Sequence, residues 1–591
     1  MEKNAGGSFL LETADPEDIF TPEDMTEEHK LVAQAAEEFL LGEVVPVIDD
    51  LEAKQEGLME KLLRKSAEVG LMGGDIPEEY GGMGLDKISS LIITEKVPLG
   101  GPFAVAVVDH TGIGSLPIVY FGNDEQKRRY LPGLANGELI GAYALTEPEA
   151  GTDALNAKTT AVLSEDGENY ILNGEKQFIT NAAYADIFIT YAKIDGEQFT
   201  GFIIDRNSEG LSLGEEEDKM GIRGTSTRSL ILENVKVPVE NLLFKPGKGH
   251  VVAFNILNIG RYKLGGACVG AAKLALGDAI QYAKSRVQFG RPIADFGLIK
   301  EKIGEMAIRT FIAESMVYRN AGLIEERLKD IDMTSPEAGY KSARGIEEYA
   351  TECSINKVYG SEMLDYVVDE TVQIHGGYGY IKDYPVERYY RDSRINRIFE
   401  GTNEINRLLI LRMLFRRAMK GQLPLVPAMK QAASDLLKPG GLRQTPQEGL
   451  EMLTHLLDNA KKIGLLTAGA AYQAHPDDLD QQQEILGMIS DIIIEIFAMD
   501  SGLLRVKKMK AKAGGEGAEI PEAIIQVYVI DAMMRIERWA KLIFAAVSSG
   551  DTLRTQLSAL KRLTRFLPVN SVALRRKIAD RMIKIGRYVA Q

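Results

Sequence analysis

Apolar residues recur at every third or fourth position over the first part of the chain, a spacing that predicts amphipathic helices. The clearest segments are residues 27–52 and 57–71, each of which has one apolar stripe to bury. The Gly-rich loop Ile76–Leu85 then interrupts the helical pattern. We therefore expect an N-terminal helical domain over residues 1–138.

The hydrophobic pattern changes after residue 139. Short runs rich in Thr, Ile, Tyr and Phe follow one another, separated by Gly, Asn and Asp, with no helical segment between them. This arrangement is typical of an antiparallel sandwich or barrel rather than a parallel sheet. We expect a middle antiparallel β domain over residues 139–248, with strands in AYALT, KTTAVL, NYILNG, KQFIT, DIFITYAK, FTGFIID and RSLILENV.

Long helical segments return after residue 249 and have the length of helices in a four-helix bundle. They cover residues 260–286 and 297–328, and a third runs from about Ala338 to Gln373. We expect this helical bundle over residues 249–420. A Pro/Gly-interrupted stretch, Gly421–Pro446, then leads into a C-terminal helical extension over residues 421–591, with a turn at Gly514–Pro521. The fold class is α+β, mainly helical.

Composition excludes several classes of protein. The 591 residues include 69 Lys and Arg against 85 Asp and Glu, a net charge of −16, which disfavours nucleic-acid binding. Two cysteines cannot build a disulfide scaffold or a thiolate zinc cluster within one chain. The longest uncharged apolar stretch, His110–Asn123, is broken by Gly and Pro, and the first residues resemble neither a signal nor a transit peptide. We expect a soluble, cytoplasmic protein of bacterial origin.

The C-terminal region departs from this acidic average. Residues 551–591 hold ten Lys and Arg against two Asp and Glu, and residues 524–547 form an amphipathic helical pattern around the single tryptophan, Trp539. Basic amphipathic helices favour anionic bilayers, so peripheral contact with the inner face of the membrane is one hypothesis. A solvated basic helix face is the alternative.

Several catalytic motifs are absent from the sequence. It has no G-x-x-x-x-G-K-[ST], no G-x-G-x-x-G between a strand and a helix, and no G-x-S-x-G. The six histidines are scattered without an H-x-x-x-H pair, so we expect no metal site. Hydrolases and metalloenzymes are therefore disfavoured.

Two segments carry the positive signal. In YALTEPEAGTDA, small and hydroxylated residues near a Gly turn let the backbone approach a flat or anionic ligand, with Thr146 and Thr152 as donors. In RIFEGTNEINR, Glu400 follows two apolar residues, and such a setting raises the pKa of a carboxyl group toward that of a general base. Taken alone, a Glu in such a segment is more often a surface or capping residue than a catalytic base.

The ordered set of motifs resembles the acyl-CoA dehydrogenases over about Glu27–Ala418. The motifs are TEPEAGTDA, KQFITNAAYADIF, KMGIRGTST, SRVQFGRPIADFGLIKEKI, QIHGGYGY and FEGTNEINR. The extra helices after Lys420 resemble the very-long-chain branch, whose members carry an additional C-terminal helical domain. The resemblance implies FAD as cofactor and oxidation of a saturated long-chain fatty acyl-CoA to the trans-2-enoyl-CoA, the first step of β-oxidation. Electron-transferring flavoprotein is the implied electron acceptor.

The same resemblance assigns roles to particular residues. Glu400 would remove the α-proton while a hydride leaves the β-carbon for flavin N5, and Gly260 stands where other members carry the base. The substrate contacts implied are Thr152, Asn258, Arg261, Phe399 and Gly401, with a structural ion pair as the alternative for Arg261. The FAD contacts implied are Tyr143, Leu145, Thr146, Thr152, Phe178, Thr180, Arg286, Gln288, Phe289, Gln373, Gly376, Gly377, Thr402, Asn403 and Glu404.

One of these positions departs from the family, which more commonly has Trp where Phe178 stands; a smaller ring still stacks on a flavin. The segments around Arg286 and Gly377 would reach the FAD of a neighbouring subunit, which implies a homo-oligomer, in the first place a dimer. The alternatives to cofactor contacts are a packed helix end at Arg286 and a helix C-cap turn at QIHGGYGY. Gly112 and Gly114 would leave room for an acyl tail, or are ordinary turn glycines.

Two other functions use the same scaffold. One is an acyl-CoA oxidase that reacts with oxygen directly. The other is a binding or assembly protein that keeps the fold but has lost turnover; the intact FEGT and flavin motifs argue against it.

Overall fold

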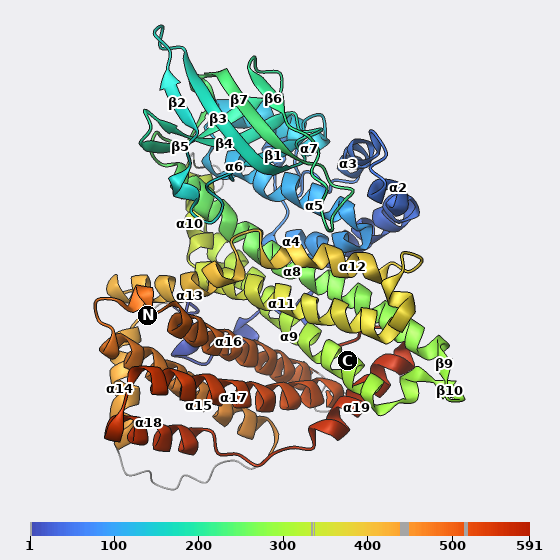
Figure 1. Cartoon of the computed structure of the whole chain (residues 1–591), viewed down its shortest axis with the longest axis vertical. Coiled ribbons are helices and arrows are strands. Elements are labelled where there is room, and N and C mark those ends of the chain that lie inside the picture. The colour runs from blue at the N-terminus through green and yellow to red at the C-terminus, as the bar shows by residue number, and fades with distance from the viewer. Residues whose placement is uncertain (1–2, 333–334, 336, 438–447, 513–517, 591) are drawn as a thin grey trace. The chain divides into compact units, whose positions relative to one another are not determined.

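The computed structural model describes residues 3–332, 335, 337–437, 448–512 and 518–590, which group into two compact units (Figure 1). The β unit comprises Met25–Ala271 and Ile324–Glu347. The bundle unit comprises Met1–Asp24, Ala272–Leu323 and Glu348–Gln591.

The β unit begins with short helices rather than the long ones that the sequence pattern predicts. The helix expected over residues 27–52 is interrupted by a π turn, Leu40–Val44, and a 3₁₀ turn, Val45–Val47. Pro46 explains the break, because proline has no N–H for the helical ladder. The helices are α1 (Glu27–Phe39), α2 (Ile48–Glu52), α3 (Leu58–Glu68), α4 (Lys87–Lys96), α5 (Pro102–Val108), α6 (Leu116–Phe121) and α7 (Asp124–Asn136).

An eight-stranded sheet follows. Its order is β6-β7-β3-β2-β4-β5-β8, with β1 paired to β4. The expected antiparallel pairing holds for most neighbours, but β1 and β2 both pair with β4 in parallel. The strands are β1 (Gly141–Ala144), β2 (Thr160–Leu163), β3 (Asn169–Thr180), β4 (Ile187–Ile194), β5 (Gln198–Asp205), β6 (Leu211–Leu213), β7 (Thr227–Pro238) and β8 (Leu242–Leu243).

Two predicted strands, NYILNG and KQFIT, form the single strand β3. Its pairing with β7 shifts register between Leu172 and Gly174 and again between Lys176 and Ile179. Such bulges re-aim side chains along a strand. Alternate residues of the sheet still fill one core, in which Phe188, Phe202 and Leu230 are fully buried.

One apolar segment of the β unit is long enough to be considered as a membrane span. Pro102–Phe121 has a mean hydropathy of 1.3, and 72% of its 18-residue window is buried in the protein. Phe103, Ala106 and Val107 of this segment belong to a hydrophobic cluster with α1 and α3. Burial of this kind is what a core helix of a folded domain shows.

The second half of the chain is helical apart from one hairpin. The predicted helix from Ala338 to Gln373 is divided between Glu347 and Ala350. The elements are α8 (Gly249–Ser285), β9 (Val287–Gln288), β10 (Arg291–Pro292), α9 (Gly297–Leu328), α10 (Ala338–Glu347), α11 (Ala350–His375), α12 (Val386–Ser393), α13 (Asn403–Met419), α14 (Leu425–Leu437), α15 (Gly449–Ala474), α16 (Gln483–Lys512), α17 (Glu519–Val547), α18 (Gly550–Leu563) and α19 (Ser571–Ile585).

Part of the expected Pro/Gly-interrupted stretch is helical. Leu425–Leu437 forms α14, and its proline, Pro427, lies in the first turn, where no intrahelical donor is needed. Residues 438–447, with the Pro-Gly-Gly sequence, lie outside the described residues, as does the first half of the turn expected at Gly514–Pro521, and α17 already begins at Glu519.

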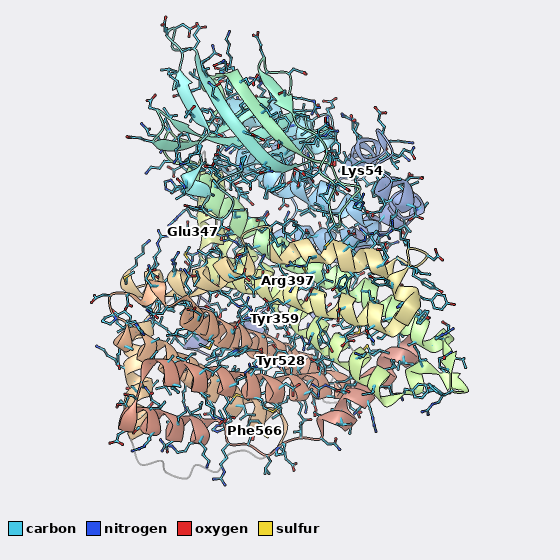
Figure 2. All side chains as sticks on the ribbon, viewed as in Figure 1. Lys54, Glu347, Tyr359, Arg397, Tyr528 and Phe566 are labelled. Atoms are coloured by element: carbon cyan, nitrogen blue, oxygen red, sulfur yellow. The ribbon has the colours of Figure 1, made fainter. Side chains whose placement is uncertain are left out.

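In the C-terminal extension, α15, α16 and α17 pack against one another, and α16 also packs on α11 and α13 (Figure 1). The rings of Tyr359 on α11 and Tyr528 on α17 are neighbours, with centroids 6.3 Å apart (Figure 2). The apolar face of α17 is buried in this packing, including Ile525, Val529 and Ile536. The amphipathic pattern around Trp539 therefore reflects bundle packing, and membrane contact would have to use other, exposed residues.

Candidate active site

Glu400 lies in a strained loop directly before α13. Its φ is +58° and that of Gly401 is +79°, so two consecutive residues are left-handed. Such a conformation is costly for a residue with a Cβ and persists only where the surroundings fix it. Glu400, Phe399 and Gly401 are all half-buried. Thr402 then caps α13, because its Oγ1 accepts a hydrogen bond of 3.3 Å from the N–H of Ile405.

Two buried side chains hold this loop from behind. The Asn406 amide donates to the carbonyl oxygens of Glu400, Gly401 and Thr402 at 3.3, 2.8 and 3.0 Å. Lys357 of α11 is fully buried and donates to the Gly401 carbonyl at 2.8 Å and to Asn403 Oδ1 at 2.7 Å. The sequence reasoning missed both residues. Asn406 was within the FEGTNEINR motif, whereas no motif marks Lys357, which lies in a predicted helix.

The residues that follow Thr402 differ in what they expose. Asn403 is buried, and its side chain bonds Lys357, Ser361 and Glu362 on α11. An FAD contact through this side chain is therefore not what the structure provides, because its polar atoms face inward. Glu404 is exposed on the first turn of α13.

The structure brings together the two segments expected to reach FAD in a neighbouring subunit. Arg286 follows α8, and its guanidinium lies over the Tyr378 ring, 5.6 Å from the centroid. Tyr378 belongs to the 3₁₀ turn Gly376–Tyr380, which follows Gln373 at the end of α11. The two segments line a cavity of about 630 Å³ with Asp278, Gln281, Tyr282, Ser285, Arg286, His375, Tyr378, Tyr384, Pro385 and Val386.

Open backbone and exposed rings at these positions fit a flat, anionic cofactor such as FAD. A Cβ built at Gly376 or Gly377 would meet nothing within 4 Å, so a ligand can approach this backbone closely. Phe289, in the β9–β10 turn beside Gln288, is 93% exposed, which is rare for such an apolar ring. Phe178 on β3 is 58% exposed with φ +60°.

In the β unit, the other residues expected to contact the flavin lie on β1, in the segment that follows it, and at the end of β3. The Gln177 N–H donates to the Thr146 carbonyl at 2.9 Å, so the segments of Thr146 and Phe178 lie side by side. Thr146 and Thr180 are half-buried and Thr152 is exposed. Leu145 and Tyr143 are buried, and the Tyr143 ring packs on Tyr191 in the core, so neither side chain presents an exposed surface to a ligand.

A buried ion pair joins these two segments. Lys176 Nζ lies 2.7 Å from Glu147 Oε1, and the Lys176 side chain is fully buried. Glu147 also accepts the N–H groups of Lys158 at 2.5 Å and Thr159 at 3.1 Å. Burial lowers the pKa of Lys176 to about 8. The pair fixes the TEPEAGTDA loop on β3, and the sequence analysis did not single it out.

Asn258 and Arg261, the two expected substrate contacts on α8, lie one helical turn apart. An Arg261 guanidinium N–H donates to Asn258 Oδ1 at 3.0 Å, and both side chains are at least 94% buried, with exposures of 5% and 6%. The structure therefore brings these two together.

Among the described residues, no group of three or more His, Cys, Asp or Glu side chains is arranged to hold a metal ion.

Four family models match the chain in order. They are described as the acyl-CoA dehydrogenase N-terminal domain (residues 26–138), middle domain (142–235) and C-terminal domain, the last of these by two models (247–415 and 459–562). The chain belongs to the acyl-CoA dehydrogenase family. The fold and family expected from the motifs are thereby confirmed, including an additional C-terminal region.

Relatives of this dehydrogenase support the same conclusion. A Bacillus subtilis (strain 168) protein named "Probable acyl-CoA dehydrogenase" is 50% identical over 584 residues, 99% of this chain and 98% of that protein. The Bos taurus "Very long-chain specific acyl-CoA dehydrogenase, mitochondrial" is 33% identical over 520 residues, 83% of this chain and 75% of the relative. A crystal structure of an acyl-CoA dehydrogenase complexed with FAD from Bacillus anthracis has a TM-score of 0.97 and 51% identity, and covers 99% of this chain and 100% of its own.

Proposed function

We propose that this chain is an FAD-dependent acyl-CoA dehydrogenase that converts a saturated long-chain fatty acyl-CoA to the trans-2-enoyl-CoA in fatty acid β-oxidation. The observation that carries the proposal is the half-buried Glu400, held in a left-handed loop at the start of α13 by Asn406 and Lys357. The relative complexed with FAD supports the cofactor. The relative named very long-chain specific supports a fatty acyl substrate.

The proposed chemistry assigns Glu400 to removal of the α-proton. The α-C–H beside a thioester is a weak acid, so the base must be fixed in place and the growing negative charge must meet preorganised donors. The loop backbone has this fixed form. FAD, when bound, accepts the hydride from the β-carbon. Arg261 and Asn258 would contact the CoA part of the substrate, following the family resemblance.

The residues that would hold FAD fall into two groups. Thr146 and Thr180 would face the polar edge of the flavin, with Phe178 against its ring. Arg286 would pair with the pyrophosphate, since a guanidinium fork suits phosphate oxygens, and Gly376 and Gly377 let the backbone approach it.

Two parts of the proposal concern partners. Electron-transferring flavoprotein is proposed as the acceptor on the family resemblance. A homodimer is proposed because the segment of Arg286, Gln288 and Phe289 would reach the FAD of a neighbouring subunit. The Phe289 ring, which is 93% exposed in the single chain, would become buried in that contact. Light scattering of the purified protein tests the second part, and a monomer with full FAD content contradicts it.

Localisation is proposed as cytoplasmic, with peripheral membrane contact as a second hypothesis. The basic helices α18 and α19 are the part of the extension that this contact would use, and Leu567 and Val572 are 64% and 60% exposed near them. Flotation with acidic liposomes tests the hypothesis: protein that stays in the soluble fraction while a peripheral control floats contradicts it.

The test of the activity is Glu400→Gln in the yellow holoenzyme. The variant keeps the shape of the side chain but has no base, so anaerobic reduction of the flavin by palmitoyl-CoA should slow by about 10²–10⁴-fold. The matched control is Glu451→Gln, an exposed Glu on the first turn of α15. A Glu400→Gln enzyme as fast as this control would refute the assignment.

The same preparation separates the alternatives. A chain-length series with a dye acceptor defines the substrate. Rapid peroxide release when the reduced enzyme meets air would favour an acyl-CoA oxidase. A wild-type holoenzyme that no acyl-CoA reduces would favour a binding or assembly protein.

A further inference from the structure

A row of polar side chains on α11 meets the loop of Glu400 along its whole length. Before the loop, Arg397 pairs with Asp365 at 2.9 Å (Figure 2 labels Arg397). Within the loop, Lys357 donates to the Gly401 carbonyl at 2.8 Å. After it, Asn403 donates to Glu362 Oε1 at 3.0 Å. Lys357, Ser361, which bonds Asn403, and Asp365 are spaced by four residues and share one helix face, with Glu362 at its edge.

The first turns of α13 carry this arrangement on to the C-terminal extension. Arg407 donates to both oxygens of Glu362, at 2.8 and 3.0 Å, and its Nε donates to Asp491 Oδ1 of α16 at 2.7 Å. The Ser490 hydroxyl donates to the Arg407 backbone carbonyl at 2.6 Å. One arginine therefore clamps α13 between α11 and α16, within two turns of Glu400.

We propose that α16 of the C-terminal extension is part of the machinery that positions the catalytic base. Ser490 and Asp491 fix α13 through Arg407, and Lys357 fixes the Gly401 carbonyl, so that the Glu400 carboxylate is held over the substrate. These four are positioning residues. The inference rests on the proposed function, in which Glu400 removes the α-proton.

The conformation of the loop is the reason that such support is needed. A left-handed Glu followed by a left-handed Gly has a costly backbone, which relaxes when its carbonyls lose their donors. A displacement of about 1 Å in a reacting group lowers the rate by about a hundredfold. Arg407 binds Glu362 through both terminal nitrogens and Asp491 through Nε, and such charge-assisted hydrogen bonds are the strong and directional ones.

The test compares two carboxylates of the extension in the holoenzyme. Asp491 and Asp531 are each paired with an arginine and have the same side-chain exposure, 21%. Asp531 of α17 pairs with Arg575 of α19 and, among the described residues, forms no hydrogen bond or ion pair with α11 or α13. Asp491→Ala, alone and with Ser490→Ala, is the test variant, and Asp531→Ala is the matched control.

We expect Asp491→Ala to lower kcat by about tenfold to a hundredfold, with KM within about twofold and unchanged flavin content. The isotope effect with α-deuterated palmitoyl-CoA should rise, because proton removal becomes slower than the other steps. Lys357→Met should act in the same way, and Lys357→Arg, which keeps a donor, should restore part of the rate. Asp531→Ala should change none of these, whatever it does to the unfolding temperature.

A second measurement does not depend on turnover. A 3-thia-acyl-CoA has an acidified α-proton, and its anion beside oxidised flavin produces a long-wavelength absorption band. Asp491→Ala should weaken this band while the probe still binds. If Asp491→Ala does not fold, Asp491→Asn, which keeps an acceptor for Arg407 but loses the charge, takes its place.

The inference is overturned if Asp491 variants retain the wild-type kcat and band, or lose kcat only as much as Asp531→Ala. This outcome is distinct from failure of the proposed function. If the proposed function fails, the wild-type flavin is not reduced by acyl-CoA, or Glu400→Gln is as active as the wild type.

Discussion

Glu352 offers a prediction whose size follows from its surroundings. It lies on the first turn of α11 and is 2% exposed. Its Oε1 accepts a hydrogen bond of 2.7 Å from the Gly7 N–H, while among the described residues its Oε2 has no hydrogen-bond partner. Burial raises the pKa of Glu352 to about 7, although the Gly7 N–H and Arg417 act in the opposite direction.

The pH dependence of stability follows from this raised pKa. The folded state holds the Glu352 proton more tightly than the unfolded state, where the pKa is about 4.5. The favourable contribution is therefore complete below about pH 4.5 and is lost as the pH rises to about 7. At about 1.4 kcal/mol per pH unit, the folded protein loses about 3 kcal/mol by pH 8.5 and only about 1 kcal/mol by pH 5.

Glu352→Gln removes the ionisation and keeps an acceptor for the Gly7 N–H. Urea unfolding should show the variant more stable than the wild type by up to about 3 kcal/mol at pH 8.5 and by about 1 kcal/mol at pH 5. Glu451→Gln, an exposed Glu, is the control and should change stability little at either pH. An equal gain at both pH values, or a loss at pH 8.5, would refute the reasoning.

Three further predictions concern the β unit. Lys176→Met leaves the Glu147 carboxylate buried without its ammonium, which should lower the free energy of unfolding in urea by about 3–5 kcal/mol; the exposed Lys158→Met is its control. Phe178→Ala should lower FAD content, measured at 450 nm, without loss of fold, since the ring is 58% exposed; full FAD content would contradict the stacking role. Gly112→Leu should reduce kcat/KM for palmitoyl-CoA more than for octanoyl-CoA, because this buried glycine has nothing within 4 Å of a Cβ; equal reductions would identify an ordinary turn glycine.

Periodicity predicted the long elements well because burial alone decides them. The structure has helices at Gly249–Ser285 and Gly297–Leu328, and the expected segments 260–286 and 297–328 end within one residue of them. Local chemistry decides the breaks instead. Pro46 interrupts a helix although the apolar residues around it keep their helical spacing. Whether two strands such as β2 and β4 pair in parallel or antiparallel depends on the folded topology and not on the pattern within either strand.

Buried charged residues, two of them at the candidate site, could not be predicted from the sequence pattern. Lys176, Lys357 and Glu352 are all buried, whereas charged residues in a pattern are assigned to the surface. What keeps each inside is a partner from a distant segment: Glu147, the Gly401 carbonyl and the Gly7 N–H. No spacing within one helix or strand reveals such partners. The motif residues were found because their identity, rather than their pattern, carries the signal.

Backbone strain occurs at three of the residues to which the family resemblance assigns a role. Phe178, Phe289 and Glu400 are non-glycine residues with φ values of +60°, +54° and +58°. Glycine would adopt this conformation at lower cost, and a bulky residue there is disfavoured by about 1–2 kcal/mol. Phe178, Phe289 and Glu400 are three of the ten non-glycine residues with positive φ among the described residues, so backbone strain alone does not select them. It agrees with the family resemblance, which assigns two of them to FAD and one to the α-proton.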